Sequence, residues 1–285
     1  MKIGIFDSGL GGLLVAKAIR KVMPEYDYVY LGDTKRVPYG NRSYETVYEF
    51  TKQGIDYLFK KENCAIVILA CNTASARALR RLQEEYLAQN FPERKILGVL
   101  IPSAEEAVNF KRVGVLATQG TVSSHTFINE IHKLNKNIKV FQNPAPMLVT
   151  LAEEGENKLA VPFLVKYLKP LLDKKIDALV LGCTHYPIFK NQIEKLIKEY
   201  TKKTEAWLPF GKNVKIISQD EIIPKKLKEY FSRHREIEEN LSKKETAHSN
   251  SSGQVKILVT DFTQNIEKLS KKWFGKNIKP ELVGI

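Results

Sequence analysis

The sequence predicts an α/β protein of two similar lobes, each a mostly parallel sheet flanked by helices. One observation is that apolar runs of strand length alternate with segments of helical periodicity along most of the chain, as in parallel sheets. The other is an internal repeat, because the segment from Ile3 to Cys71 matches the segment from Val113 to Cys183 in order and nearly in length. A repeat of half a protein indicates two related lobes.

The clearest repeated unit is a buried strand that ends in a cysteine followed by polar residues. It reads AIVILACNTA at 65–74 and ALVLGCTHYP at 178–187. Continuous apolar runs of this length are typical of parallel strands that are covered on both faces. Cys71 and Cys183 therefore stand at equivalent strand ends. Two facing lobes would place one thiol on each side of a shared cleft, and we expect the active site there.

The other elements follow from periodicity and from turn signals. Strands are expected at 2–7, 28–31, 65–70, 96–100, 113–117, 138–142, 178–181, 214–217 and 255–260, and helices at 12–22, 44–61, 76–87, 102–110, 123–134, 160–172, 189–203, 221–239 and 262–274. We expect the strand at 214–217 to return to the first lobe. The predicted domains are therefore 1–97 plus 213–285, with a flexible polar loop at 242–254, and 98–212.

Composition narrows the class further. The 285 residues are 43% hydrophobic and 27% charged, which is ordinary for a soluble globular protein, and no apolar run is long enough to span a bilayer. The start MKIGIFDSG lacks the pattern of a signal peptide, so we expect a cytoplasmic protein. The net charge of +13 could attract an anionic substrate, but no nucleic-acid-binding motif accompanies it.

The three cysteines, Cys64, Cys71 and Cys183, have no C-x-x-C spacing, which disfavours a disulfide framework or a zinc ribbon. Cys64 precedes a strand without polar neighbours and is interpreted as a small buried hydrophobe. Cys183-x-His185 offers too few ligands for a metal. The same pair could act as a cysteine nucleophile with a histidine base, but this hypothesis leaves Cys71 unexplained.

The glycine-rich turn after the first strand suggests a dinucleotide site, but Leu14 stands where the third glycine of that fingerprint is needed. Asp7 and Ser8 would also set a carboxylate beside the pyrophosphate. The amides at this turn remain suited to a small anion such as a carboxylate. Asp7 and Ser8 could equally be helix-capping residues.

At these positions the chain resembles the cofactor-independent aspartate/glutamate racemases, and the glutamate racemases among them in particular. The matching segments are IGIFDSGLGGL (3–13), YLGDTKRVPYGNRS (30–43), ILACNTASA (68–76) and LVLGCTHYP (179–187), with GVLATQGTV (114–122) as a looser match. Pro102-Ser103 stands where relatives often have Pro-Gly.

The resemblance implies an isomerase without cofactor or metal, commonly a homodimer, that converts L-glutamate to D-glutamate for peptidoglycan synthesis and so for cell wall biogenesis and cell shape. By position, Cys71 matches the catalytic cysteine that acts on D-glutamate and Cys183 the one that acts on L-glutamate. The residues that match substrate-holding positions are Asp7, Ser8, Tyr39, Gly40, Asn72, Thr73, Thr184 and His185. Asp7, His185 and Glu153 match polar groups that assist the thiols.

The chemistry agrees with this resemblance. Inverting an α-carbon requires an acid/base group on each face, and a thiol with a reference pKa of about 8.5 can take and give a proton near neutral pH. An aspartate or other acidic amino-acid racemase, a Cys-His amidohydrolase and a nucleic-acid-binding module remain as alternatives. We expect a small-molecule substrate, no specific nucleic acid and no membrane partner.

Overall fold

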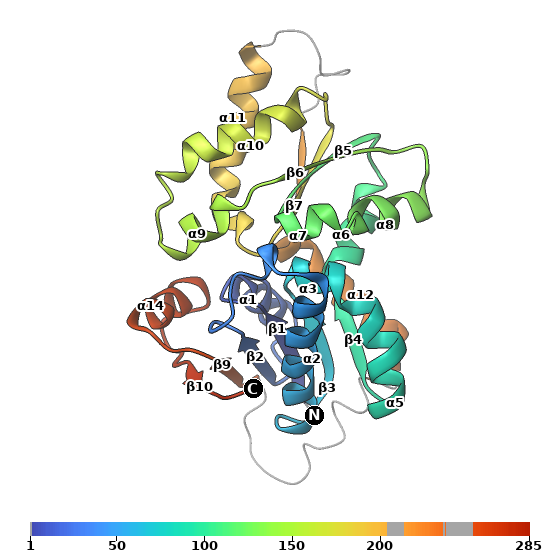
Figure 1. Cartoon of the computed structure of the whole chain (residues 1–285), viewed down its shortest axis with the longest axis vertical. Helices are drawn as coiled ribbons and strands as arrows, with labels where there is room; N and C mark the ends of the chain where they lie inside the picture. Colours follow the sequence, from blue (N-terminus) through green and yellow to red (C-terminus); the bar gives the residue numbers. More distant parts are fainter. Residues whose placement is uncertain (1, 204–213, 236, 238–252) are drawn as a thin grey trace. The chain divides into compact units, whose positions relative to one another are not determined.

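The computed structural model describes residues 2–203, 214–235, 237 and 253–285. The chain divides into two compact units, the first comprising Met1–Val99 and Asp220–Ile285, the second Leu100–Gln219. Each unit has its own parallel sheet with its own helices (Figure 1). This arrangement confirms the predicted α/β class with two similar, mostly parallel sheets.

In the described part of unit 1, six strands lie in the order β10-β9-β2-β1-β3-β4, and every pair is parallel. Its elements are β1 (Lys2–Asp7), α1 (Gly12–Val22), β2 (Tyr28–Gly32), the 3-10 turn η1 (Tyr39–Asn41), α2 (Tyr44–Lys60), β3 (Cys64–Leu69), α3 (Asn72–Arg77), α4 (Leu79–Arg81), the π-helical segment η2 (Leu82–Leu87), α5 (Ala88–Asn90), β4 (Lys95–Gly98), most of α12 (Gln219–Arg233), β9 (Val255–Val259), α14 (Gln264–Trp273) and β10 (Glu281–Leu282).

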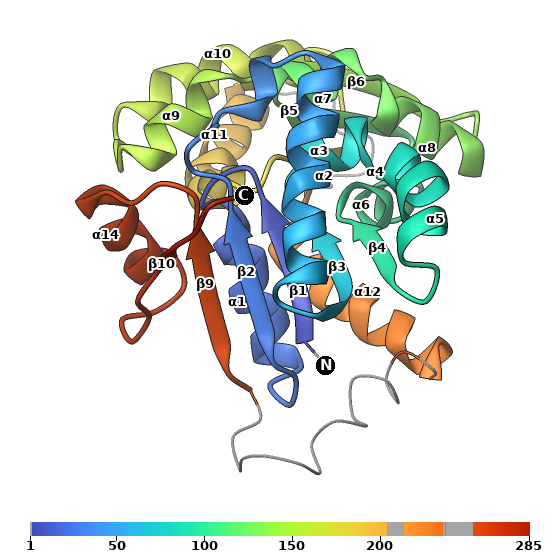
Figure 2. The same cartoon turned by 60° about the horizontal axis from the view of Figure 1, so that its bottom comes forward.

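Helices cover both faces of this sheet. Figure 2 shows α2 in front of the strands and α1 behind them, and α14 packs beside α1. The strands β2 and β3 are buried along their whole length, as expected for a parallel sheet covered on both faces. Strand β9 pairs with β2, so the C-terminal stretch completes the first sheet as predicted.

Unit 2 repeats the design. It contains α6 (Leu100–Ala107), β5 (Arg112–Ala117), α7 (Gln119–Ser123), α8 (Thr126–Leu134), β6 (Lys139–Pro144), α9 (Met147–Glu153), α10 (Ala160–Leu172), β7 (Ala178–Gly182), η3 (Tyr186–Phe189), α11 (Lys190–Lys203) and β8 (Lys215–Ile217). Its described strands are parallel in the order β6-β5-β7-β8, which matches β2-β1-β3-β4 of unit 1 strand for strand. The central strands β1 and β5 are equivalent, and so are the cysteine strands β3 and β7.

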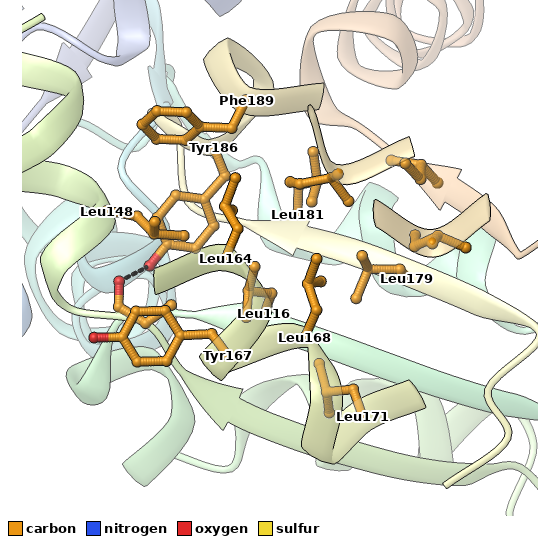
Figure 3. Packing of buried hydrophobic residues seen from close by; sticks show 14 of the residues in the cluster. Leu116, Leu148, Leu164, Tyr167, Leu168, Leu171, Leu179, Leu181, Tyr186 and Phe189 are labelled. Carbon is orange, nitrogen blue, oxygen red and sulfur yellow. Dashed lines mark hydrogen bonds between the residues drawn. The ribbon is translucent and has the colours of Figure 1, made fainter. Parts of the chain in front are cut away.

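The core of unit 2 fixes the cysteine strand from one face. Leucines 164, 168 and 171 of α10 pack against Leu179 and Leu181 of β7, together with Tyr186 and Phe189 just beyond the strand (Figure 3). All of these side chains are almost completely buried. Burial of a leucine contributes roughly 1.5–3 kcal/mol, so this cluster holds the end of β7 in place.

Two predictions about unit 2 are corrected. The strand predicted to return from 214–217 to the first lobe is β8, which instead pairs with β7 at the edge of the second sheet. Ile216 and Ile217 are buried there, so the strand completes the core of unit 2. The helix expected at 123–134 begins only at Thr126 as α8, because His125 adopts a left-handed conformation with φ of 54° and separates it from α7.

Residues 242–252 of the predicted polar loop, and part of the helix predicted at 221–239, lie outside the described residues. Among the residues that are described, every helix is too short or too polar to cross a membrane.

Candidate active site

The first cysteine lies at the carboxyl end of the sheet in unit 1. Cys71 follows β3, is 5% exposed and occupies the N-cap position of α3. Its Sγ accepts a hydrogen bond from the Ala74 amide at 3.5 Å and donates one to the Ser8 hydroxyl at 3.3 Å. A backbone N–H directed at the sulfur favours the thiolate.

Asp7 and Ser8 reach the same edge from the neighbouring strand β1. The Asp7 carboxylate is fully buried, and its Oδ2 accepts a hydrogen bond from the Gly9 amide at 3.0 Å. Helix α1 has Gly11 at its N-cap, so Asp7 and Ser8 lie before the cap position of this helix. Gly12 allows α1 to begin here, because a Cβ on it would lie 2.7 Å from the Asp7 Cβ.

Asn72 and Thr73, the first two residues of α3, are both 2% exposed and lie directly after Cys71. The turn η1, which contains Tyr39 and Gly40, packs against the same helix. The structure therefore brings all the predicted site residues of the first half to one edge of one sheet.

The Tyr39 side chain is already occupied within the protein. Its ring is 1% exposed, lies between Phe6 and Phe50, and its hydroxyl donates a hydrogen bond to Asp33 Oδ2 at 2.5 Å. Burial, and next the charge of Asp33, raise the pKa of Tyr39 well above its usual value, so the phenol stays neutral. Its backbone and that of Gly40 remain as groups that could contact a ligand.

The second cysteine has a different set of partners. Cys183 follows β7 directly and is 6% exposed. Its Sγ lies 3.7 Å from His185 Nδ1, and His185 Nε2 lies 3.0 Å from Oε1 of Glu153, the last residue of α9. Burial alone would lower the pKa of His185, but hydrogen bonds with Cys183 and Glu153 outweigh it and raise that pKa well above the usual value.

Buried contacts fix the segment that carries these groups. The Tyr186 amide donates to the Cys183 carbonyl at 3.1 Å, and the Tyr186 hydroxyl donates to the Ala145 carbonyl at 2.8 Å (Figure 3). Thr184 is 3% exposed between the thiol and the imidazole. Cys183, Thr184, His185 and Glu153 thus form a rigid constellation at the carboxyl end of the second sheet.

The two constellations share a backbone frame and differ in their side chains. Leu69 at the end of β3 pairs with Phe6, and Gly182 at the end of β7 pairs with Ala117. The next pair along β1 and β3 is Asp7 beside Ala70, the residue before Cys71, and Gly182 is the residue before Cys183. Ala117 therefore holds in unit 2 the position that Asp7 holds in unit 1. Unit 1 supplies its carboxylate directly from the central strand. In unit 2 the carboxylate is that of Glu153 on α9, and the His185 imidazole connects it to the thiol of Cys183.

Asp33 is a residue beside the candidate site that the sequence analysis did not single out, yet its buried carboxylate receives the Tyr39 hydroxyl. The available signal was its place after strand β2, the neighbour of β1 on the side away from β3.

Cys64 differs from the other two thiols. It lies at the amino end of β3 with no exposed surface, and burial raises the pKa of its thiol to about 12. All three cysteines are outside disulfides. Among the described residues, no group of three or more histidine, cysteine, aspartate or glutamate side chains could hold a metal ion.

Two duplicated parallel-sheet units, each with a buried and hydrogen-bonded thiol at the carboxyl end of its sheet, form an α/β protein suited to thiol-based proton transfer or nucleophilic chemistry. Residues 14–207 match the family described as Asp/Glu/Hydantoin racemase. The chain belongs to this family of racemases, which are isomerases.

The relatives of the chain are glutamate racemases by name. The chain is 35% identical to a glutamate racemase of Aquifex aeolicus, over 99% of this chain and 97% of that one. It is 36% identical to "Glutamate racemase 3" of Caldanaerobacter subterraneus, over 94% and 89%. The crystal structure of a Francisella tularensis glutamate racemase in complex with D-glutamate matches with a TM-score of 0.83 and 30% identity, over 99% of this chain and 97% of the other.

Proposed function

We propose that this chain is a glutamate racemase that interconverts L-glutamate and D-glutamate without a cofactor, with Cys71 and Cys183 as its two acid/base groups. The observation that carries the proposal is the pair of buried thiols at equivalent ends of β3 and β7. The choice of glutamate is supported by the names of the relatives and by the Francisella tularensis complex.

In the proposed reaction, one sulfur removes the α-proton and the other returns a proton to the opposite face of the carbon. From L-glutamate, the Cys183 thiolate takes the proton and the Cys71 thiol delivers its own, which leaves Cys71 as thiolate and Cys183 as thiol. D-glutamate runs the same steps in reverse. This would require the two units, Met1–Val99 with Asp220–Ile285 and Leu100–Gln219, to act as lobes that enclose one substrate.

The partners of each thiol support these roles. The positive imidazolium favoured by Glu153 would stabilise a thiolate on Cys183, and the Ala74 amide would do so on Cys71. Asp7, Ser8, Asn72, Thr73, Thr184 and His185, with the backbone of Tyr39 and Gly40, would hold the substrate. One well-placed donor to the carboxylate that gains charge in the transition state would contribute roughly 2.7–4 kcal/mol.

The test is racemisation in heavy water. Each newly formed enantiomer should carry deuterium at the α-carbon, and inversion without this label would contradict the two-base mechanism. The variants Cys71→Ser and Cys183→Ser should each lose turnover in both directions. Cys64→Ala is the matched control, since its thiol lies at the other end of β3, and it should keep the wild-type rate. The same assay with L-aspartate decides between glutamate and the alternative acidic substrate.

One observation favours a second candidate. Cys183, His185 and Glu153 lie in line, as a nucleophile, base and orienting carboxylate do in cysteine hydrolases. A Cys-His amidohydrolase would form a thioester on Cys183 and would be indifferent to loss of Cys71. Mass spectrometry of the protein quenched during turnover distinguishes the two, because the racemase forms no covalent adduct.

In the cell, we propose that this activity supplies D-glutamate for peptidoglycan and hence for cell wall biogenesis and cell shape, from a cytoplasmic homodimer. Growth of a D-glutamate auxotroph that expresses the chain would support the role, and failure of an expressed, active chain to restore growth would contradict it. Light scattering of the purified protein tests the dimer.

A further inference from the structure

Asp33 lies at the centre of a buried polar cluster beside the first thiol. It follows β2 directly, and its carboxylate has no exposed surface. Three side chains donate to it: the Tyr39 hydroxyl at 2.5 Å, Arg36 Nε at 2.6 Å and the Thr260 hydroxyl at 2.8 Å. A buried carboxylate is costly unless it is paired and hydrogen-bonded, and these three donors meet that requirement for Asp33.

The cluster is connected to the candidate site through the backbone. The Asp33 amide donates to the Asp7 carbonyl at 3.0 Å, which ties the start of the 33–40 segment to the end of β1. At its other end, this segment becomes η1, which packs against α3, the helix that begins beside Cys71. Arg77 of α3 also donates to the Arg42 carbonyl at 2.5 Å, just past η1.

The C-terminal strand supports the cluster from the opposite side. Thr260, which follows β9, accepts from the Lys35 amide at 3.0 Å while it donates to Asp33. Thr34 and the Asp261 backbone exchange two hydrogen bonds of 2.9 Å. The carboxylate of Asp33 therefore joins the 33–41 segment to Thr260 beyond β9, and the η1 end of that segment is held to it through Tyr39.

We propose that Asp33 is a positioning residue, which acts through the Tyr39 hydroxyl to hold the backbone of Tyr39 and Gly40 where the substrate is bound. This inference rests on the proposed glutamate racemase function. Asp33 itself touches no reacting atom in this scheme. Because the Tyr39 hydroxyl is committed to Asp33, the contribution of that hydroxyl to substrate binding is also indirect.

The test compares KM and kcat in three variants, each measured with both enantiomers. Asp33→Asn keeps the size of the side chain and removes its charge, and Tyr39→Phe keeps the ring and removes only the donor. Each should raise KM for L- and D-glutamate by about tenfold, while kcat changes by less than about threefold, because a contact made equally to substrate and transition state is lost. The double variant should show about the same rise as one single variant, because both changes break one interaction.

Glu62→Gln is the matched control. Glu62 is another buried carboxylate of unit 1, it is paired with Lys256 at 2.8 Å and Lys2 at 3.5 Å, and it lies at the amino end of β3, away from the candidate site. The Glu62→Gln variant should be less stable toward urea than the wild type, and its KM for glutamate should be unchanged.

The outcomes separate the two proposals. A wild-type chain that does not racemise glutamate refutes the proposed function. An active wild type whose Tyr39→Phe and Asp33→Asn variants keep their KM, whatever their stability, overturns the positioning role alone. So does a double variant with about a hundredfold rise, since additive effects would mean that the two residues act separately. If Asp33→Asn does not fold, the KM of Tyr39→Phe decides, because that change leaves the buried charge pair intact.

Discussion

Gly32, the last residue of β2, lies so close to the backbone of Gly9 that a side chain added to it would test the geometry around Cys71. A Cβ added at Gly32 would lie 2.3 Å from the carbonyl oxygen of Gly9 and 3.2 Å from the Tyr30 ring. Gly9 follows Ser8, the hydroxyl partner of Cys71, and its carbonyl also accepts the Tyr30 hydroxyl at 2.8 Å. We predict that Gly32→Ala damages both stability and activity.

The magnitude follows from this contact. Non-bonded atoms of this kind are best separated by about 3.5 Å, so the backbone at Gly9 must move by roughly 1 Å or the strands must separate. Overpacking of this kind costs roughly 1–3 kcal/mol, and more where the neighbour is backbone. A displacement of about 1 Å close to the reacting groups can reduce the rate about 100-fold.

Urea unfolding followed by circular dichroism measures the first effect, and kcat/KM for glutamate the second. Gly284→Ala is the control, because a Cβ there meets no atom within 4 Å and the φ of Gly284 lies outside the left-handed region. Its free energy of unfolding should stay within about 0.5 kcal/mol of the wild type. If Gly32→Ala had the urea midpoint and rate of the wild type, β2 and the Gly9 turn could not be packed as described.

Three further changes test other parts of the structure. Glu153→Gln should destabilise unit 2 most near neutral and slightly acidic pH. The raised pKa of His185 means that the stabilisation is complete below the unfolded value of about 6.5 and is lost as the pH rises through the folded value, so urea midpoints of variant and wild type should converge at alkaline pH. Leu168→Ala, at a 1% exposed position of the α10 core, should cost about 2–5 kcal/mol in urea unfolding, and a loss below 1 kcal/mol would contradict the packing. Ser43→Ala should cost about 0.5–2 kcal/mol, because the Ser43 hydroxyl caps α2 by accepting from the Thr46 amide at 3.2 Å; an unchanged thermal midpoint would contradict this.

The sequence was most informative where local pattern and tertiary structure follow one rule. Apolar runs of four to six residues predicted the buried strands, and the repeat predicted that the cysteine strands β3 and β7 would occupy equivalent places beside β1 and β5. It was less informative where a choice depends on partners distant in the chain. Strand β8 was assigned to the wrong sheet, because VKII at 214–217 would fit either edge equally well.

The same limit explains what was missed in the site. The sequence places Asp33 after a strand, but the three donors to its carboxylate come from residues 36, 39 and 260, and no local pattern joins the last to the others. Likewise, Glu153 was named only from the resemblance, because its contact with His185 crosses 32 positions. Capping by Asp7 or Ser8 was equally compatible with the sequence, and only the structure shows that Gly11 occupies the N-cap position of α1.

The difference between the two thiol environments is itself an argument about the proposed reaction. Enantiomers have equal free energies in water, so kcat/KM of a racemase must be equal in the two directions, whichever sulfur carries the proton in the free enzyme. A duplicated fold with identical partners would satisfy this by symmetry. Here, Cys71 has a helix amide and the Ser8 hydroxyl, and Cys183 has an imidazole braced by Glu153. The two sets stabilise thiolate by different means, and removal of Glu153 should favour the form with the proton on Cys183. Because kcat/KM must stay equal in the two directions, the imbalance would appear as a KM that rises more for L-glutamate, whose Cys183 thiolate form is depleted, than for D-glutamate.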